Sequence, residues 1–121
     1  MVGNKITVGG ASPLHPDNWY RQQRGFKMTP EAKVKAKVKS ILKELNAYYA
    51  MPMGTGYGSS GVPDFLVCYQ GRFYGIECKA NGNKPTALQM FNLMEIRRCG
   101  GIGLVIDETN VDTLKKELQN D

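Results

Sequence analysis

The sequence predicts one α/β domain in which helices and short strands follow the order α-β-β-β-α-β-α. Two observations carry this prediction: apolar residues recur with the helical period in three segments, and the segments between them are short runs rich in aromatic and β-branched residues. The chain has 121 residues, 41% of them apolar, which is enough for one core of two packed layers. We therefore expect one domain, residues 29–121, behind an irregular arm of residues 1–28.

The first helix is expected to begin at residue 29. Thr29 can cap the free amides of a helix, Pro30 suits its first position, and Glu31 is favoured at the positive end of its dipole. The helix is expected to end at Asn46. One apolar stripe along it should face the core, formed by Val34, Val38, Ile41, Leu42 and Leu45.

Glu31 lies on this inward stripe, three residues before Val34 and seven before Val38. A carboxylate on an inward helix face needs an explanation. The residues alone leave two explanations open, a capping role at the start of the helix or a ligand that points into a site.

Three strands are expected before the second helix. Ala47–Met51 is a short strand-like run, and Phe65–Tyr69 and Arg72–Lys79 are rich in aromatic and β-branched residues. Between the last two, Gln70-Gly71 predicts a tight two-residue turn.

A capping box predicts where the second helix begins, because Gln89 follows Thr86 by three residues. The helix is expected to end at Gly100-Gly101. Its apolar side chains are Leu88, Phe91, Met94 and Ile96.

The last two elements are a short buried strand and a helix. The strand is Ile102–Ile106, and Asn110 is expected to cap the helix that follows. In this helix Val111, Leu114 and Leu118 share one face.

Positive charge is concentrated in the N-terminal third. The chain carries sixteen Lys and Arg against eleven Asp and Glu, a net charge of +5. Residues 1–47 hold nine basic and three acidic side chains, or +6, which leaves seven and eight, or −1, for residues 48–121. A basic region suits a polyanionic partner such as nucleic acid. A solvated, lysine-rich helix face would explain the charge equally well.

The arm interleaves aromatic and basic residues, which can stack on bases and pair with phosphates. It could instead dock onto its own domain or onto a second subunit. The glycine-rich loop at residues 54–61 allows close approach of a phosphate but lacks the pattern of a P-loop. The candidate DNA-contacting residues are Arg21, Arg24, Lys33, Lys37, Tyr57 and Lys84.

Cysteine and histidine usage excludes several classes of site. The three cysteines form no CxxC pair, and we expect reduced, buried thiols in a soluble, cytoplasmic protein. His15 is the only histidine, so one chain cannot build a Cys2His2 or three-histidine zinc site. No segment approaches the roughly 20 apolar residues of a membrane span, and residues 1–10 lack the apolar block of a signal peptide. Any catalytic metal would be a hard ion held by oxygen ligands.

The predicted hairpin brings two carboxylates together. With a two-residue turn, Asp64 lies directly opposite Glu77, where like charges repel. Either water screens them at the sheet ends, or Lys79 neutralises both, or they share a divalent cation. Magnesium prefers one or two carboxylates with water and phosphate oxygens, which suits a phosphodiester substrate. Lys79, on the same face as Glu77, could then orient or deprotonate the attacking water or stabilise the transition state.

These residues resemble a known signature. Pro63-Asp64, then twelve residues, then Glu77-Cys78-Lys79 is similar to the PD-(D/E)xK pattern of the restriction-endonuclease-like superfamily. Gly61-Val62-Pro63-Asp64, Ile76-Glu77-Cys78-Lys79 and the helix that begins with Thr86 and Gln89 resemble the virus-type replication-repair nuclease (VRR-NUC) family more narrowly. The resemblance covers about residues 29–118, and the small stand-alone members of the family occur in bacteriophages.

The resemblance implies a restriction-endonuclease-like core, with a mixed central sheet flanked by helices, and an endonuclease that depends on Mg²⁺ or Mn²⁺. The catalytic residues that it implies are Asp64, Glu77, Lys79, Glu31 and Gln89. The metal ligands that it implies are Asp64, Glu77, Glu31 and the backbone carbonyl of Cys78. The Cys78 side chain should point away from the site, and the capping box alone also accounts for Gln89.

Small phage members of the family look like four-way-junction resolvases that act as symmetric dimers. The resemblance therefore implies a homodimer that cuts branched DNA, with the Holliday junction as the leading substrate, and no membrane partner. Flaps, nicked ends or plain duplex are alternative substrates. A different class, a non-catalytic DNA-binding module with a structural acidic cluster, also remains open.

Overall fold

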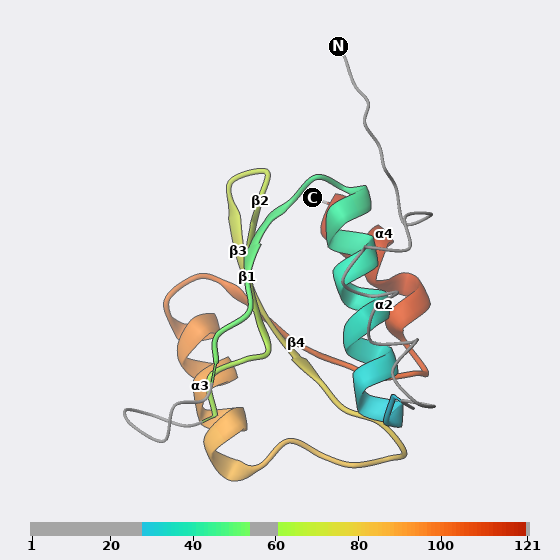
Figure 1. Cartoon of the computed structure of the whole chain (residues 1–121). Coiled ribbons are helices and arrows are strands. Elements are labelled where there is room, and N and C mark those ends of the chain that lie inside the picture. The colour runs from blue at the N-terminus through green and yellow to red at the C-terminus, as the bar shows by residue number, and fades with distance from the viewer. Residues whose placement is uncertain (1–27, 54–60, 121) are drawn as a thin grey trace.

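The computed structural model describes residues 28–53 and 61–120 (Figure 1). The helices and strands in these residues follow the predicted order. The elements are α2 (Pro30–Glu44), β1 (Tyr48–Ala50), β2 (Phe65–Tyr69), β3 (Arg72–Cys78), α3 (Ala87–Arg98), β4 (Ile102–Ile106), the 3-10 helix η2 (Val111–Thr113) and α4 (Leu114–Gln119). The predicted order α-β-β-β-α-β-α is confirmed. Arg21 and Arg24 of the arm and Tyr57 lie outside the described residues, and the division at residue 28 stays a prediction.

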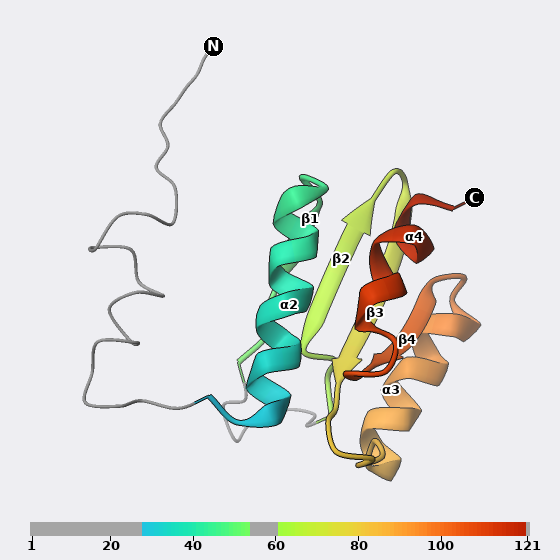
Figure 2. The ribbon, with the colours of Figure 1, turned by 90° about the vertical axis from the view of Figure 1, so that its right-hand side faces the viewer.

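The strands form one mixed sheet in the order β1-β2-β3-β4. β1, β2 and β3 pair antiparallel, while β3 and β4 are parallel and are connected through α3. In Figure 1 the sheet lies between α2 and α4 on one side and α3 on the other, and Figure 2 shows α2 and α4 side by side on their face. The mixed sheet flanked by helices is therefore confirmed.

The core lies between the sheet and the α2/α4 layer. The predicted stripe of α2 faces it, with Val34, Val38 and Leu42 buried, and Ile41 and Leu45 pack at its margin. The predicted face of the C-terminal segment is also buried. The sheet contributes Phe65, Val67, Tyr74, Ile76 and Cys78. Burying side chains of this size provides most of the driving force for folding.

The second helix, α3, leaves most of its apolar side chains exposed. Of its residues Leu93 is the one that is fully buried, whereas Leu88, Phe91 and Met94 are exposed. Glycines explain the difference, because a Cβ atom at Gly103 would lie 2.9 Å from the backbone oxygen of Leu93. The helix backbone therefore approaches the sheet closely and buries few side chains.

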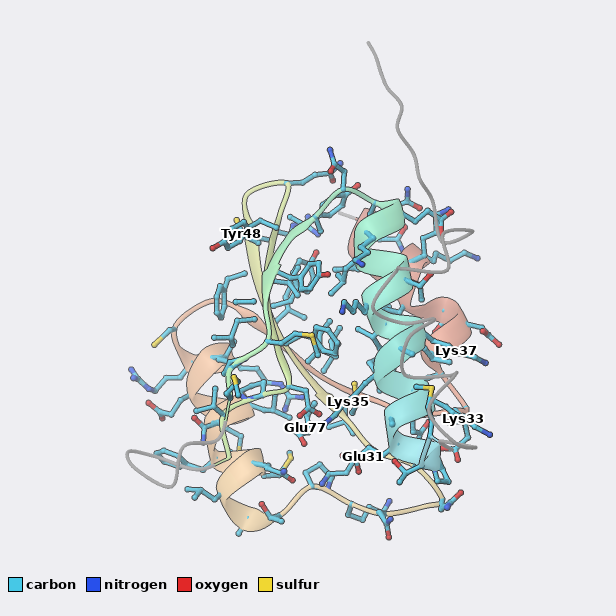
Figure 3. The ribbon with its side chains drawn as sticks, viewed as in Figure 1. Glu31, Lys33, Lys35, Lys37, Tyr48 and Glu77 are labelled. Atoms are coloured by element: carbon cyan, nitrogen blue, oxygen red, sulfur yellow. The ribbon has the colours of Figure 1, made fainter. Side chains whose placement is uncertain are left out.

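The expectation of three buried thiols is wrong for two of them. Cys78 is buried, but Cys68 and Cys99 are exposed, and all three are free. Cys68 pairs with Tyr48 on one side and with Phe73 on the other, and the three residues form one exposed row across the sheet. Figure 3 shows Tyr48 on the side of the sheet away from α2. No helix covers this row near the hairpin turn, so the cysteine alternates out of the core.

The last helix also begins later than predicted. Asn110 makes no capping hydrogen bond, and residues Val111–Thr113 form the 3-10 turn η2 before α4. The reason is that the Asn110 side chain is engaged elsewhere: its Oδ1 accepts from the amide of Asp107 and its Nδ2 donates to the carbonyl of Val105.

None of the helices among the described residues is long and apolar enough to cross a membrane.

Candidate active site

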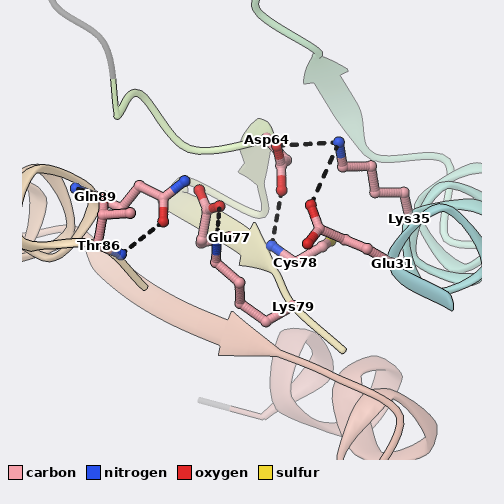
Figure 4. Close-up of polar contacts among 8 residues, drawn as sticks. All are labelled: Glu31, Lys35, Asp64, Glu77, Cys78, Lys79, Thr86 and Gln89. Atoms are coloured by element: carbon pink, nitrogen blue, oxygen red, sulfur yellow. Dashed lines mark hydrogen bonds and ion pairs between the residues drawn. The ribbon is translucent and has the colours of Figure 1, made fainter. Parts of the chain in front are cut away.

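The predicted hairpin register is confirmed, but Asp64 is not part of the ladder. Phe65 pairs with Ile76 and Tyr69 with Arg72, as a two-residue turn requires. β2 begins one residue after Asp64, because the Asp64 carboxylate accepts a hydrogen bond of 2.9 Å from the amide of Cys78 (Figure 4). This contact fixes Asp64 at the open end of the hairpin, beside the end of β3.

Glu77 is the buried carboxylate of this end. Its exposed fraction is 2%, and its Oε1 has no hydrogen-bond partner. Burial, followed by repulsion from Asp64, raises the pKa of Glu77 to about 7, and the nearby Lys79 only partly offsets this rise. A buried carboxylate oxygen without a partner is costly, and an added cation would relieve that cost.

Lys79 lies on the same side as Glu77, as the strand alternation predicts. Its Nζ is 3.8 Å from Glu77 Oε2, and its side chain is largely buried. Its amide donates to the carbonyl of Ile106, which ties the residue to the end of β4. The ammonium is therefore held at the site by backbone as well as by charge.

Glu31 reaches the site from the first turn of α2. The side-chain cap of the helix is Thr29, whose hydroxyl accepts from the amide of Ala32, so Glu31 is not needed for this contact. Glu31 Oε2 lies 3.9 Å from Lys35 Nζ, and the same ammonium lies 3.5 Å from Asp64 Oδ1. The Glu31 side chain is more exposed than those of Asp64 and Glu77.

Lys35 is the residue of the site that sequence reasoning missed. Its signal was available: it follows Glu31 by four residues, so the two share one helix face. Lys33 and Lys37 differ, because both are exposed and lie on the side of α2 away from Glu77, whereas Lys35 points toward it (Figure 3). Lys84 is exposed in the segment before α3.

Gln89 serves the capping box and also faces the site. The side-chain Oε1 of Gln89 accepts a hydrogen bond from the backbone amide of Thr86. The backbone amide of Gln89 donates to the Thr86 hydroxyl. The side-chain nitrogen of Gln89 points toward the Glu77 carboxylate in Figure 4. The carbonyl end of the side chain thus completes the cap and leaves the amide end for the site.

Cys78 turns its side chain into the core, as expected. Burial raises the pKa of the Cys78 thiol, and the carboxylates of Asp64 and Glu77 raise it further. The thiol lies in the hydrophobic core, where its protonated form is favoured. What Cys78 brings to the site is its backbone, through the amide that binds Asp64.

A pocket of about 390 Å³ adjoins these residues at the N-terminal end of α2. Its lining is mainly polar and joins the start of α2 to the segment after β3. The lining residues are Thr29, Pro30, Glu31, Ala32, Lys35, Ala80, Asn81 and Asn83.

The donor set fits a hard divalent cation that shares its coordination with substrate. Within residues 28–53 and 61–120, no three His, Cys, Asp or Glu side chains lie together as a ready-made metal cage. Asp64 and Glu77 offer two carboxylates, and Glu77 Oε1 is buried without a partner. Mg²⁺ characteristically takes one or two carboxylates and completes its shell with water and phosphate oxygens.

The structure is an α/β domain with an acidic, lysine-containing site at the open end of its hairpin. A solved structure described as "VRR_NUC domain" matches it with a TM-score of 0.59 and 24% identity, over 74% of this chain and 97% of that chain. This match confirms the fold that the sequence resemblance predicted. No protein-family model matches the sequence, and neither does any curated protein.

Proposed function

We propose that this chain is a metal-dependent endodeoxyribonuclease that hydrolyses phosphodiester bonds in branched DNA, with the four-way (Holliday) junction as its substrate. The observation that carries the proposal is the buried Glu77 carboxylate, whose Oε1 has no partner and which is flanked by Asp64 and Lys79. A binding protein gains nothing from burying a carboxylate in this way, whereas a cation-dependent site needs one. The VRR_NUC-like fold supports the same reading.

The proposed metal ligands are Asp64 and Glu77, with the carbonyl of Cys78 and Glu31 as further oxygen donors. When bound, Mg²⁺ or Mn²⁺ would supply Lewis-acid stabilisation of the charge that develops on the phosphate. The amide of Cys78 orients the Asp64 carboxylate through the 2.9 Å hydrogen bond.

Lys79 is the proposed catalytic residue that acts on the attacking water. Its side chain is held near Glu77 and is largely shielded from water. As an ammonium it can orient the attacking water or stabilise the pentavalent transition state, and as a neutral amine it can accept the proton of that water. Gln89 is the proposed positioning residue, because its side-chain nitrogen points toward the Glu77 carboxylate (Figure 4).

The proposed DNA contacts extend beyond this centre. Lys33 and Lys37 are exposed on the side of α2 away from Glu77 and Lys84 is exposed before α3, so they would bind phosphates farther from the cut. Arg21, Arg24 and Tyr57, outside the described residues, complete the proposed set.

We propose in addition that the active form is a two-fold homodimer, since resolving a junction requires two matching cuts. One observation supports an association of this kind: Tyr48 and Phe73 are exposed in one row on the sheet face, where a single copy leaves apolar surface in water. Sedimentation equilibrium of the full chain should give twice its mass of 13.4 kDa, and a single-chain mass at micromolar concentration would contradict the dimer.

The test is cleavage of a labelled four-way junction beside matched linear duplex, flap and single strand, in Mg²⁺ or EDTA. Paired symmetric nicks on the junction alone should depend on Mg²⁺ and disappear in Asp64→Asn. Lys39→Met, at a half-buried position of α2 outside the proposed site, is the control and should cut normally. Cutting of another substrate would keep the nuclease and reject the junction.

The alternative function is a DNA-binding module, and one observation favours it: Lys35 and Lys79 already pair with the carboxylates, as in a structural ion cluster. Junction binding without cutting in Mg²⁺ or Mn²⁺, unchanged in Asp64→Asn, would decide for this alternative.

A further inference from the structure

Lys35 holds an unusual position among the lysines of α2. Its ammonium bridges two carboxylates from different parts of the chain, Glu31 of α2 and Asp64 before β2, at 3.9 and 3.5 Å (Figure 4). Lys79, in contrast, pairs with Glu77. Lys35 therefore pairs with two of the three carboxylates and Lys79 with the third. Among the described residues, Glu77 Oε1 is the one side-chain oxygen that is buried without a hydrogen-bond partner.

Lys35 also borders a polar pocket. It lines the pocket of about 390 Å³ at the N-terminal end of α2, together with Glu31, Asn81 and Asn83. Its side chain is 37% exposed, so a rotation of its flexible four-carbon stem can carry the charge from Asp64 into the pocket.

A divalent cation at Asp64 would compete with the Lys35 ammonium for one carboxylate oxygen, Oδ1, because Oδ2 accepts from the amide of Cys78. Both are positive, and at separations near 4 Å their repulsion exceeds thermal energy even in a solvated site. A metal ion that takes Asp64 must therefore displace Lys35. The displaced charge then lies beside a polar pocket at the edge of the site, where a phosphate oxygen is its natural partner.

We propose that Lys35 is an exchangeable counter-ion of the metal site: it neutralises Asp64 and Glu31 before metal binds, and it moves to a DNA phosphate in the adjacent pocket when metal takes its place. This inference rests on the proposed function and adds a residue that couples metal binding to substrate binding. Without DNA, a metal ion must compete with the Lys35 ammonium for Asp64. With DNA bound, the ammonium pairs with a phosphate instead and no longer competes for Asp64.

The first experiment is isothermal titration calorimetry of Mn²⁺ alone into the full chain at low salt, without DNA. Lys35→Met should bind Mn²⁺ about tenfold more tightly than the unmodified chain, because its competitor is gone. Lys35→Arg keeps the charge and should bind as the unmodified chain does, and so should the matched control Lys39→Met. Circular dichroism verifies that each variant is folded.

The second experiment measures DNA binding in Ca²⁺ as a function of salt. Lys35→Met should bind a four-way junction more weakly, and the slope of log affinity against log salt should fall by about one, as expected for one lost phosphate contact. Lys39→Met should keep the slope. An unchanged slope in Lys35→Met would overturn the move to phosphate.

The outcomes separate this inference from the proposed function. Unchanged or weaker Mn²⁺ binding in Lys35→Met, in a chain that binds Mn²⁺ and cuts DNA through Asp64, overturns the counter-ion role alone. A chain that binds no Mn²⁺ through Asp64 and cuts no DNA overturns both.

Discussion

The two ends of α2 each carry contacts between lysine and carboxylate, and they differ in kind. At the C-terminal end, Lys115 of α4 lies 2.6 Å from Glu44, and both side chains are well exposed. At the N-terminal end, the separations of Lys35 from its carboxylates are longer, but Glu77 next to them is buried. The shorter contact is the weaker indication of function, because water and salt screen an exposed pair.

The charge balance of the two ends differs as well. Glu44 and Lys115 form a one-to-one pair, whereas at the N-terminal end Glu31, Asp64 and Glu77 face two ammonium groups. The N-terminal cluster therefore has one carboxylate more than it has ammonium groups, and burial raises the pKa of its Glu77 carboxyl. An unbalanced, partly buried cluster is what a cation-dependent site requires, and a balanced surface pair is what a helix-to-helix contact requires.

The largest expected difference between the two ends is catalytic. Lys79→Met should lower the single-turnover rate of DNA cleavage in Mg²⁺ by about 10²- to 10⁴-fold, the usual range for loss of a proton-transfer group. Lys115→Met, the matched change at the other end, should leave the rate within about twofold. Equal losses in the two variants would show that general charge, not the site, supports cleavage.

The next effect concerns stability and pH. The pKa of Glu77 is about 7 in the folded protein against an ordinary value of 4.5, so between these values the unfolded chain ionises first and the folded state loses stability as pH rises. Glu77→Gln should therefore unfold like the unmodified chain at pH 4 but be more stable at pH 8, by roughly 3 kcal/mol.

Urea denaturation in EDTA at both pH values measures this difference. Glu44→Gln is the control, because a change at the exposed pair should move the free energy of unfolding by no more than about 1 kcal/mol, and by the same amount at both pH values. A Glu77→Gln variant that is less stable at pH 8 would mean that the carboxylate is fully compensated in the fold.

The smallest effect is the coupling of the surface pair itself. A double-mutant cycle of Glu44→Gln and Lys115→Met should give a coupling energy of about 0.2 to 1 kcal/mol at low salt, which disappears in 1 M salt. Thermal unfolding of the four proteins provides the values. A larger coupling that persists in 1 M salt would show that the Glu44–Lys115 pair stabilises the packing of α4 on α2. The two ends of α2 would then not differ in the strength of their ion pairs.

Local rules explain how much of the fold was predictable. The turn at Gln70-Gly71 determines the hairpin register, and the spacing of Val34, Val38 and Leu42 determines which side of α2 is buried. One exception arises where two local contacts compete for the same side chain. Asn110 does not cap its helix because its side chain binds the backbone of Val105 and Asp107, which are close to it in the sequence.

The candidate site divides in the same way. Successive side chains of an extended strand point to opposite faces of the sheet. The sequence by itself therefore predicts that Lys79 lies on the same face as Glu77 and that the Cys78 side chain lies on the other face, as the structure shows. The position of Lys35 between Glu31 and Asp64 depends on how α2 packs against the hairpin.

What the sequence determined by itself is therefore the order of elements, the hairpin register and the residues that can supply oxygen ligands and a proton. Only the tertiary structure decided that the Glu77 carboxylate is buried with one unpartnered oxygen, that Asp64 is held by the amide of Cys78, and that Lys35 occupies the space between carboxylates. The physical reason is that burial and electrostatic balance depend on atoms distant in the chain, whereas turns, caps and periodicity depend on neighbours within a few residues.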